Sequence, residues 1–200
     1  MEKKPVVTLS DRYLHALNYA NACHTEQVRK STVLPYILHP MGVSSLVLEA
    51  GGDEDMAIAA LLHDVPEDCG GEARLVEIKK YYGDRVEKIV RGCSDSLVAD
   101  REDKAPWLER KQAHIDHMKE ADMDTLVVTA ADKLHNGRAI ATDLQCTGNE
   151  VWDRFNAGRE DIIAYYTKFL AALEERKVTP VLLKPLSNAI EIMKSVSADS

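Results

Sequence analysis

Apolar residues recur every three or four positions along most of this chain, a spacing that predicts amphipathic helices. In the first third of the chain the predicted helices cover residues 10–27, 39–52 and 53–64. Ser10 supplies an N-cap for the first helix and Asp53 for the third, and Gly51 ends the second. Residues 53–64 are apolar on nearly every side, which indicates a helix inside the core.

The rest of the chain continues this helical pattern. Gly83 is expected to divide residues 71–95 into two helices, and residues 149–176 form either one long helix or two. Between them lie a polar helix over 104–121 and an apolar one over 123–144. No stretch alternates apolar and polar residues over more than a few positions, so no strand is predicted. The sequence therefore predicts an all-α fold, a single compact helical bundle.

Length and composition fit one folded domain. The chain has 200 residues, of which 45% are hydrophobic, enough to bury most of the surface of the unfolded chain. We expect residues 1–9 to be a tail, residues 10–176 to form the domain, and residues 177–200 to hold a C-terminal helix and a disordered tail. The charge-rich stretch over residues 94–106 is expected to be a solvated loop or a lid over a site.

Charge and hydropathy narrow the classes of partner. A formal net charge of −8 gives no basic field for a nucleic-acid polymer, although local basic clusters can bind a small phosphorylated ligand. No apolar stretch approaches the roughly 18 residues that span a bilayer, and the N-terminus lacks the apolar core of a signal peptide. We therefore expect no membrane association and a cytoplasmic protein. The four cysteines form no CxxC pair and are interpreted as reduced structural thiols.

Polar residues stand beside several of the apolar runs. His39 begins one predicted helix, His63 and Asp64 end the most apolar one, and Asp132 follows the run LVVTAA. Singly, each has an ordinary role as a helix cap, a core histidine or a buried acceptor. Together they are costly to bury without a partner, and neutral imidazole and carboxylate are ligands that suit Mn²⁺, Fe²⁺, Co²⁺ or Zn²⁺. We therefore predict that these four residues bind one divalent cation.

Three motifs carry a resemblance to a known family. A histidine, then an adjacent His–Asp pair, then a distant aspartate is the signature of the HD superfamily of metal-dependent phosphohydrolases. RKSTVLPYILHP, AALLHDVPED and AADKLHNGRAI resemble the RK...PYI.HP, AALLHDxxED and LADKLHNxR segments in the hydrolase domain of Rel/Spo alarmone enzymes. The similarity covers roughly residues 12 to 175.

The resemblance implies an activity and a cofactor. Members of the Rel/Spo hydrolase family use Mn²⁺ to hydrolyse the 3′-pyrophosphate of purine alarmones, (p)ppGpp or (p)ppApp. The products are GDP/GTP or ADP/ATP plus pyrophosphate. His39, His63, Asp64 and Asp132 would then be the metal ligands. The adjacent pair Glu67 and Asp68 would orient and deprotonate the attacking water. Glu67 follows His63 by four residues, which places both on one helix face if the helix continues.

One residue departs from the family pattern. Pro66 stands where related proteins usually carry an aliphatic residue. Proline lacks the amide that would bond back to Leu62, so we expect the helix to kink or end there. The reach of Glu67 toward the metal depends on that break.

Several residues are candidates for binding the nucleotide. By resemblance, Arg29 and Lys30 match the basic pair that meets the base and phosphates, and Asn136 matches an asparagine near the ribose and phosphate. Arg138 is a further candidate for phosphate contact, and Arg159 for the purine pocket. His135 is interpreted as a packing residue rather than a ligand.

Some Rel/Spo enzymes are bifunctional and add a synthetase domain and regulatory domains to the hydrolase domain. Because 200 residues leave no room for these, we expect the chain to resemble the stand-alone small alarmone hydrolases. Guanosine and adenosine alarmones stay open as substrates. The alternatives are an NADPH 2′-phosphatase, a general HD nucleotidase, or an inactive HD module that binds nucleotide and signals. A homo-oligomer is also left open.

Overall fold

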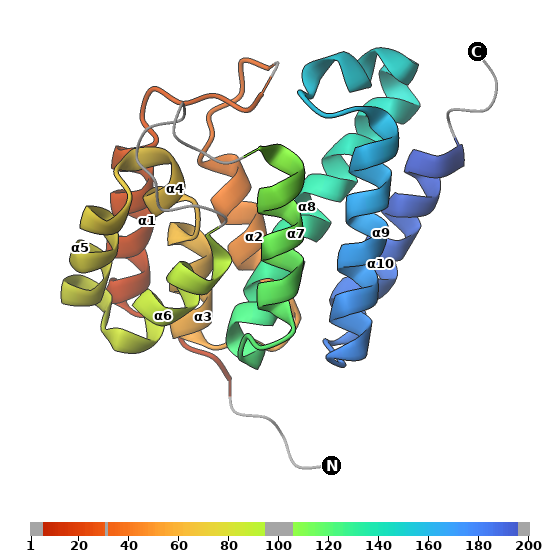
Figure 1. The fold of residues 1–200 in the computed structure, drawn as a ribbon. Helices are drawn as coiled ribbons and strands as arrows, with labels where there is room; N and C mark the ends of the chain where they lie inside the picture. The colour runs from red at the N-terminus through yellow and green to blue at the C-terminus, as the bar shows by residue number, and fades with distance from the viewer. Residues whose placement is uncertain (1–5, 31, 95–105, 196–200) are drawn as a thin grey trace.

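The computed structural model of the protein describes residues 6–30, 32–94 and 106–195. Within these ranges the chain forms helices, and its only β-pairing is an isolated antiparallel bridge between Val28 and Pro35. The predicted all-α fold is confirmed (Figure 1). Nearly all of the predicted loop or lid over 94–106 lies outside the described residues, as do the last five residues of the predicted disordered tail.

The helices follow one another closely along the chain. Their bounds are α1 (Asp11–Cys23), α2 (Leu38–Glu49), α3 (Glu54–Leu62), α4 (Val65–Cys69), α5 (Glu72–Tyr82), α6 (Asp84–Cys93), α7 (Trp107–Met118), α8 (Met123–Thr147), the 3-10 helix η1 (Gly148–Arg154), α9 (Arg159–Glu175) and α10 (Pro180–Ser195).

Short polar side chains and glycines fix where several helices begin and end. Ser10 caps α1 as predicted, and Asp53 caps α3 by accepting a hydrogen bond from the backbone N–H of Met56 at 3.1 Å. Gly83 divides α5 from α6 with φ of 95°, a backbone conformation that favours glycine. The region predicted as one helix or two after Asn149 contains two, the short 3-10 helix η1 and then α9.

The core lies around α3 and α8. Residues Ala57 to Leu62 of α3 are fully buried, and this helix packs against α1, α2, α6 and α8. The long helix α8 also packs against α9 and α10. It therefore runs between the N-terminal helices and the C-terminal pair (Figure 1). The predicted helix within 53–64 therefore lies in the core, although it ends at Leu62.

The C-terminal helix joins the same core. Leu182, Leu186 and Met193 of α10 are buried, and α10 packs along α8. The packing of α10 is continuous with that of the preceding helices. The predicted division of the chain at residue 176 stays a prediction. In the described part of the chain, no helix combines the length and the apolar character needed to cross a bilayer.

Candidate metal centre and adjoining cavity

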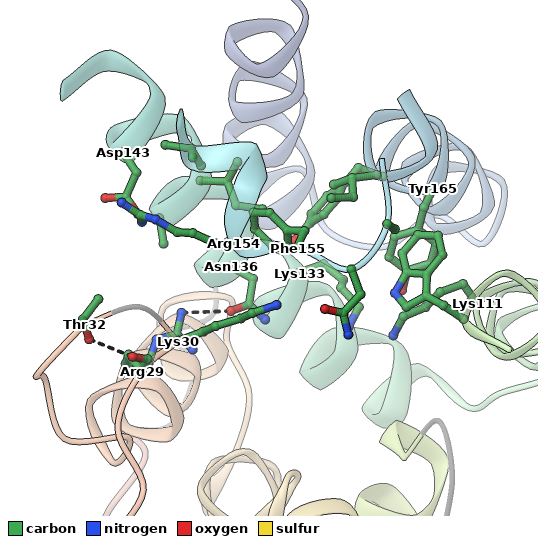
Figure 2. A pocket seen from close by; sticks show the side chains of 18 of the residues that line it. Arg29, Lys30, Thr32, Lys111, Lys133, Asn136, Asp143, Arg154, Phe155 and Tyr165 are labelled. Carbon is green, nitrogen blue, oxygen red and sulfur yellow. Dashed lines mark hydrogen bonds and ion pairs between the residues drawn. The ribbon is translucent and has the colours of Figure 1, made fainter. Parts of the chain in front are cut away.

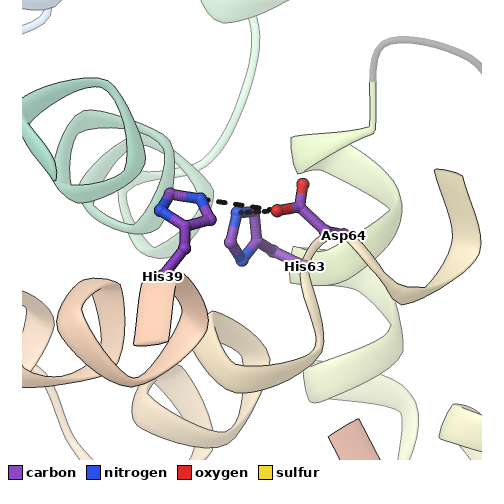
Figure 3. Close-up of side chains that lie close together, drawn as sticks. All are labelled: His39, His63 and Asp64. Atoms are coloured by element: carbon purple, nitrogen blue, oxygen red, sulfur yellow. Dashed lines mark ion pairs between the residues drawn. The ribbon is translucent and has the colours of Figure 1, made fainter. Parts of the chain in front are cut away.

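Three parts of the fold bring the four predicted ligands together. His39 lies in the first turn of α2, His63 and Asp64 form the break between α3 and α4, and Asp132 lies in α8. Figure 3 shows the first three side chains converging. The two histidines and Asp132 are buried, with exposed fractions of 1%, 3% and 8%.

One atom of each side chain faces the same point. The Nε2 atom of His39 lies 3.4 Å from Oδ2 of Asp64 and 3.1 Å from Oδ1 of Asp132. The Nε2 atom of His63 lies 3.1 Å and 3.7 Å from the same two oxygens. Metal–ligand bonds of about 2.1 Å at right angles place neighbouring ligand atoms about 3.0 Å apart. The spacing therefore fits a shared cation.

The hydrogen bonding of His63 supports this fit. Its Nδ1 lies 2.8 Å from the backbone carbonyl oxygen of Ala60, which can only accept, so Nδ1 carries the proton. In the neutral ring Nε2 then presents a lone pair to two carboxylates. This buried atom has no hydrogen-bond partner among the described residues. A cation between these groups would satisfy all of them.

The pKa values of Asp64, Asp132 and His63 also indicate that this cluster favours a positive charge beside its carboxylates. Burial raises the pKa of the Asp64 carboxyl, but His63 and His39 outweigh it and hold the pKa well below its usual range. For Asp132 burial is likewise outweighed by Lys133 and the two histidines, and the pKa falls well below the usual range. Burial lowers the pKa of His63, but Asp64 and Asp132 outweigh it and hold the pKa well above its usual range. Both carboxylates are therefore ionised at neutral pH.

Two further side chains orient the carboxylates. The hydroxyl of Tyr36 donates to Oδ2 of Asp64 at 2.6 Å, and the ammonium of Lys133 lies 2.7 Å from Oδ2 of Asp132. Sequence reasoning assigned neither residue a role. Their closeness in sequence to two predicted ligands could have identified them. Tyr36 stands three residues before His39, and Lys133 directly follows Asp132.

His135 lies in direct contact with a predicted ligand. Its Nδ1 is 2.9 Å from Nδ1 of His39. Burial and the nearby His39 and Arg29 lower the pKa of His135 to about 4, so this ring is uncharged at neutral pH. The contact is more specific than the packing role that the sequence predicted.

The predicted catalytic pair lies in α4, directly after the metal cluster. Pro66 occupies the first turn of this helix, where a missing N–H costs nothing, so the chain breaks at His63–Asp64, before the proline. Glu67 therefore does not share a continuous helix face with His63. The carboxylate of Glu67 lies 3.9 Å from Arg110, and Asp68 accepts a hydrogen bond from Gln27 at 2.8 Å.

A cavity of about 520 Å³ adjoins the cluster (Figure 2). Asn136 and Lys133 belong to both, since they line the cavity and contact Asp132. Basic and aromatic side chains make up much of the wall. The basic ones are Arg29, Lys30, Lys111, Lys133 and Arg154, and the aromatic ones are Tyr36, Trp107, Phe155, Tyr165 and Tyr166.

Three of the five predicted substrate-binding residues line this cavity. The guanidinium of Arg29 donates to Oδ1 of Asn136 at 3.1 Å and lies over the ring of Tyr36. The Nδ2 group of Asn136 donates to Asp132 at 2.6 Å. Lys30 lies 5.3 Å from the ring centroid of Phe155, also at the wall. Arginine, asparagine and the candidate metal centre are thus joined in one chain of contacts.

The other two predicted residues lie elsewhere. Arg138 is exposed and is not part of the cavity wall, because it follows Asn136 by two positions and so points about 200° around the axis of α8. Arg159 lies over the ring of Trp152 and donates to the backbone carbonyl of Lys194 at 3.4 Å. Arg159 is not among the residues that line the cavity.

Fold and site together define an all-α protein with a buried histidine–carboxylate cluster beside a basic and aromatic cavity. A family model described as HD domain matches residues 16–163. The chain belongs to the HD domain family.

Curated relatives and solved structures agree with this membership. Guanosine-3′,5′-bis(diphosphate) 3′-pyrophosphohydrolase MESH1 of Xenopus tropicalis is 35% identical over 64% of this chain and 68% of the relative. The Drosophila melanogaster protein of the same name is 32% identical over 72% and 75%. A solved structure described as a metazoan ortholog of SpoT that hydrolyzes ppGpp matches 96% of this chain and 99% of that chain, with 28% identity and a TM-score of 0.74.

Proposed function

We propose that this protein is a metal-dependent hydrolase that releases pyrophosphate from the 3′ position of purine alarmones, (p)ppGpp or (p)ppApp. The observation that carries the proposal is the convergence of four imidazole and carboxylate ligand atoms beside a basic cavity. The names of the relatives support the same reaction, because they are guanosine-3′,5′-bis(diphosphate) 3′-pyrophosphohydrolases. The substrate is then a small nucleotide rather than a nucleic-acid polymer.

His39, His63, Asp64 and Asp132 would hold the cation. When bound, it supplies Lewis-acid polarisation of a phosphoryl oxygen and a lowered pKa for the attacking water. We propose Mn²⁺ as the ion, because the Rel/Spo alarmone hydrolases that the motifs resemble use it and a set of two imidazoles and two carboxylates can bind it. Tyr36 and Lys133 hold the two carboxylates in place through their contacts at 2.6 Å and 2.7 Å.

Glu67 and Asp68 would act on the water. One carboxylate accepts a proton from the water while the water oxygen bonds to the phosphorus attached to the 3′ oxygen. The bond between this phosphorus and the 3′ oxygen breaks, pyrophosphate is released, and the 3′ oxygen takes up a proton to become the 3′-hydroxyl. Gln27, which donates to Asp68 at 2.8 Å, orients one carboxylate of the pair, and Arg110 lies 3.9 Å from the other. Both acids follow the proposed ligand Asp64 within four residues, in the helix that begins at Val65, and this short separation supports a role at the metal.

The cavity wall would bind the rest of the nucleotide. Guanidinium and ammonium groups attract phosphate, and a planar guanidinium can also stack on a purine. Arg29, Lys30 and Lys111 supply such charges, and the ring of Phe155 offers an apolar surface for the base. Asn136 lies between Arg29 and Asp132, at the junction of the cavity and the metal centre.

A substrate panel tests the proposal. Purified protein with Mn²⁺ is incubated separately with guanosine alarmones, adenosine alarmones, NADPH and ordinary nucleotides, and products are separated by chromatography. We expect pyrophosphate and the matching 5′-nucleotide from an alarmone, and no reaction with chelator. Inorganic phosphate from NADPH or a mononucleotide as the only product would instead favour a phosphatase or nucleotidase. Replacing Mn²⁺ by Mg²⁺, Co²⁺ or Zn²⁺ in the same assay tests the choice of ion.

The catalytic pair gives a sharper test. Glu67→Gln and Asp68→Asn remove the proton acceptor but keep size and hydrogen bonding, so each is expected to lower kcat by about 10² to 10⁴. Mn²⁺ affinity is expected to stay near the wild-type value. Glu72→Gln, which alters an acid that pairs with Arg91, serves as the matched control and should keep full activity. Full activity in both test variants would remove the pair from the mechanism.

A further inference from the structure

The histidine that follows the metal ligand of α8 by three residues contacts a ligand from another helix. His135 Nδ1 lies 2.9 Å from Nδ1 of His39, and the two ring centroids are 4.8 Å apart. The other nitrogen of His39 faces the candidate cation position, 3.1 Å from Asp132. Both nitrogens of His39 are therefore engaged, one by Asp132 and the other by His135, which share one face of α8.

Hydrogen-bond chemistry assigns the protons of this pair. A cation needs a lone pair on Nε2 of His39, and a neutral imidazole carries only one N–H, which must then be on Nδ1. That group can donate only to a lone pair on Nδ1 of His135. The proton of His135 consequently lies on its own Nε2, on the far side of the ring.

We propose that His135 is a positioning residue for the metal centre, which accepts a hydrogen bond from Nδ1–H of His39 and so holds Nε2 of His39 toward the cation. This proposal rests on the metal site of the proposed function. Ligating histidines commonly donate their second N–H to a carboxylate, carbonyl or water, and here another imidazole takes that part.

Gly42 leaves the space that this arrangement needs. A Cβ atom on Gly42 would lie 2.3 Å from Nε2 and 2.4 Å from Cδ2 of His135, too close for either ring atom to stay in place. Gly42 follows His39 by three residues on α2, and His135 follows Asp132 by three on α8. On α2, the proposed ligand His39 and Gly42 therefore share one helix face. On α8, the proposed ligand Asp132 and His135 do the same.

The experiment measures Mn²⁺ binding without substrate, by the electron paramagnetic resonance signal of the free ion. His135→Phe keeps a ring of similar size but removes the acceptor, and we expect its affinity for Mn²⁺ to fall about 10- to 100-fold. His135→Asn keeps an acceptor oxygen near the position of Nδ1 and is expected to stay within a few fold of wild type. His15→Phe removes an imidazole that bonds to Tyr82 in another part of the molecule, and is the control.

A second variant tests the same contact from the other helix. Gly42→Ala should displace His135 and weaken Mn²⁺ binding in the same direction. In the double variant with His135→Phe the two losses should not add, because the hydrogen bond is already absent. Circular dichroism melting of the metal-free variants confirms that only folded proteins are compared. In Zn²⁺-loaded wild type, long-range ¹H–¹⁵N spectra should show a protonated Nδ1 on His39.

Three results would overturn the proposal. These are wild-type affinity in His135→Phe, a loss in His135→Asn as large as in His135→Phe, and wild-type protein that binds no Mn²⁺. Failure of the proposed function would look different. In that case wild type hydrolyses no alarmone, while the order of Mn²⁺ affinities among the variants is retained.

Discussion

Asn136 and His39, at the candidate metal centre, each make contacts with both of their polar side-chain atoms. Asn136 donates to Asp132 with its amide nitrogen and accepts from Arg29 with its oxygen. His39 similarly faces the carboxylates with one nitrogen and His135 with the other. Because both ends are held, rotation of either side chain would break two contacts. The ligand atoms are therefore positioned before any cation or nucleotide binds, which reduces the ordering cost of binding.

The thiol of Cys69, which directly follows the predicted catalytic pair, gives a prediction about pH. Burial, with Cys23 and Asp68 adding to it, raises the pKa of Cys69 to about 11. A raised pKa keeps the thiol protonated to higher pH, so only about 10⁻³ of it is thiolate at pH 8. Iodoacetamide should therefore label Cys69 very slowly at pH 8, with a rate that rises about tenfold per pH unit up to about pH 11.

The exposed Cys146 is the internal comparison for this labelling. Peptide mapping after brief treatment at pH 8 should find Cys146 modified and Cys69 intact. Rapid labelling of Cys69 in folded protein at that pH would contradict the prediction.

At the level of helices, the sequence predicted the starts of helices better than their ends. Ser10 and Asp53 cap α1 and α3 through local hydrogen bonds that a sequence shows directly. The helix over residues 53–64 was predicted to end at Asp64, with a break expected at Pro66, whereas α3 ends two residues earlier, at Leu62. The chain turns at His63–Asp64 so that both side chains reach ligands from α2 and α8, and such tertiary contacts leave no local signal.

An ion-pair cluster ties the N-terminal ends of two of these helices to α6. Arg85 of α6 contacts Asp53 at the start of α3 at 2.7 Å and Asp124 in the first turn of α8 at 2.8 Å. Asp53→Ala removes both the cap and one ion pair, and we expect a loss of about 1 kcal/mol in the free energy of unfolding at pH 7. Urea unfolding of variant and wild type measures the difference.

The same variant has a defined pH dependence. Burial raises the pKa of Asp53, but Arg85 and the N–H of Met56 outweigh it and lower the pKa below its usual 3.8. A depressed pKa means that the stabilisation is present above pH 3.8 and is lost as pH falls through the folded-state value. The stability difference should therefore vanish below that pH. Lys79→Ala, which breaks an exposed pair with Asp84, is the control and should change stability little.

Across the whole molecule, the convergence of the four candidate metal ligands could be predicted and much of the cavity could not. His39, His63, Asp64 and Asp132 were found because each is a polar residue beside an apolar run and their order matches a known motif. Other wall residues come from α7, η1 and α9, where they look like ordinary surface or core positions. Only the packing of these helices against α8 brings them together.

Metal binding should consequently stabilise the whole fold, because the ligands come from α2, the α3–α4 break and α8. A ligand present at 100 times its dissociation constant stabilises the folded state by about 2.7 kcal/mol. For a protein of this size that corresponds to a rise in Tm of roughly 5 to 10 °C. Scanning calorimetry of wild type with chelator and with increasing Mn²⁺ should show this rise.

Asp64→Ala should abolish the shift, since it removes an oxygen that lies 3.1 Å from His63 and 3.4 Å from His39. Asp116→Ala, which removes an exposed carboxylate paired with Lys119 on α7, should keep the full shift. The comparison separates binding at the cluster from nonspecific binding to an acidic surface, because both variants lose one negative charge. An equal rise in Tm for Asp64→Ala and wild type would show that Mn²⁺ stabilises the protein somewhere else, and the cluster would lose its role as the metal centre.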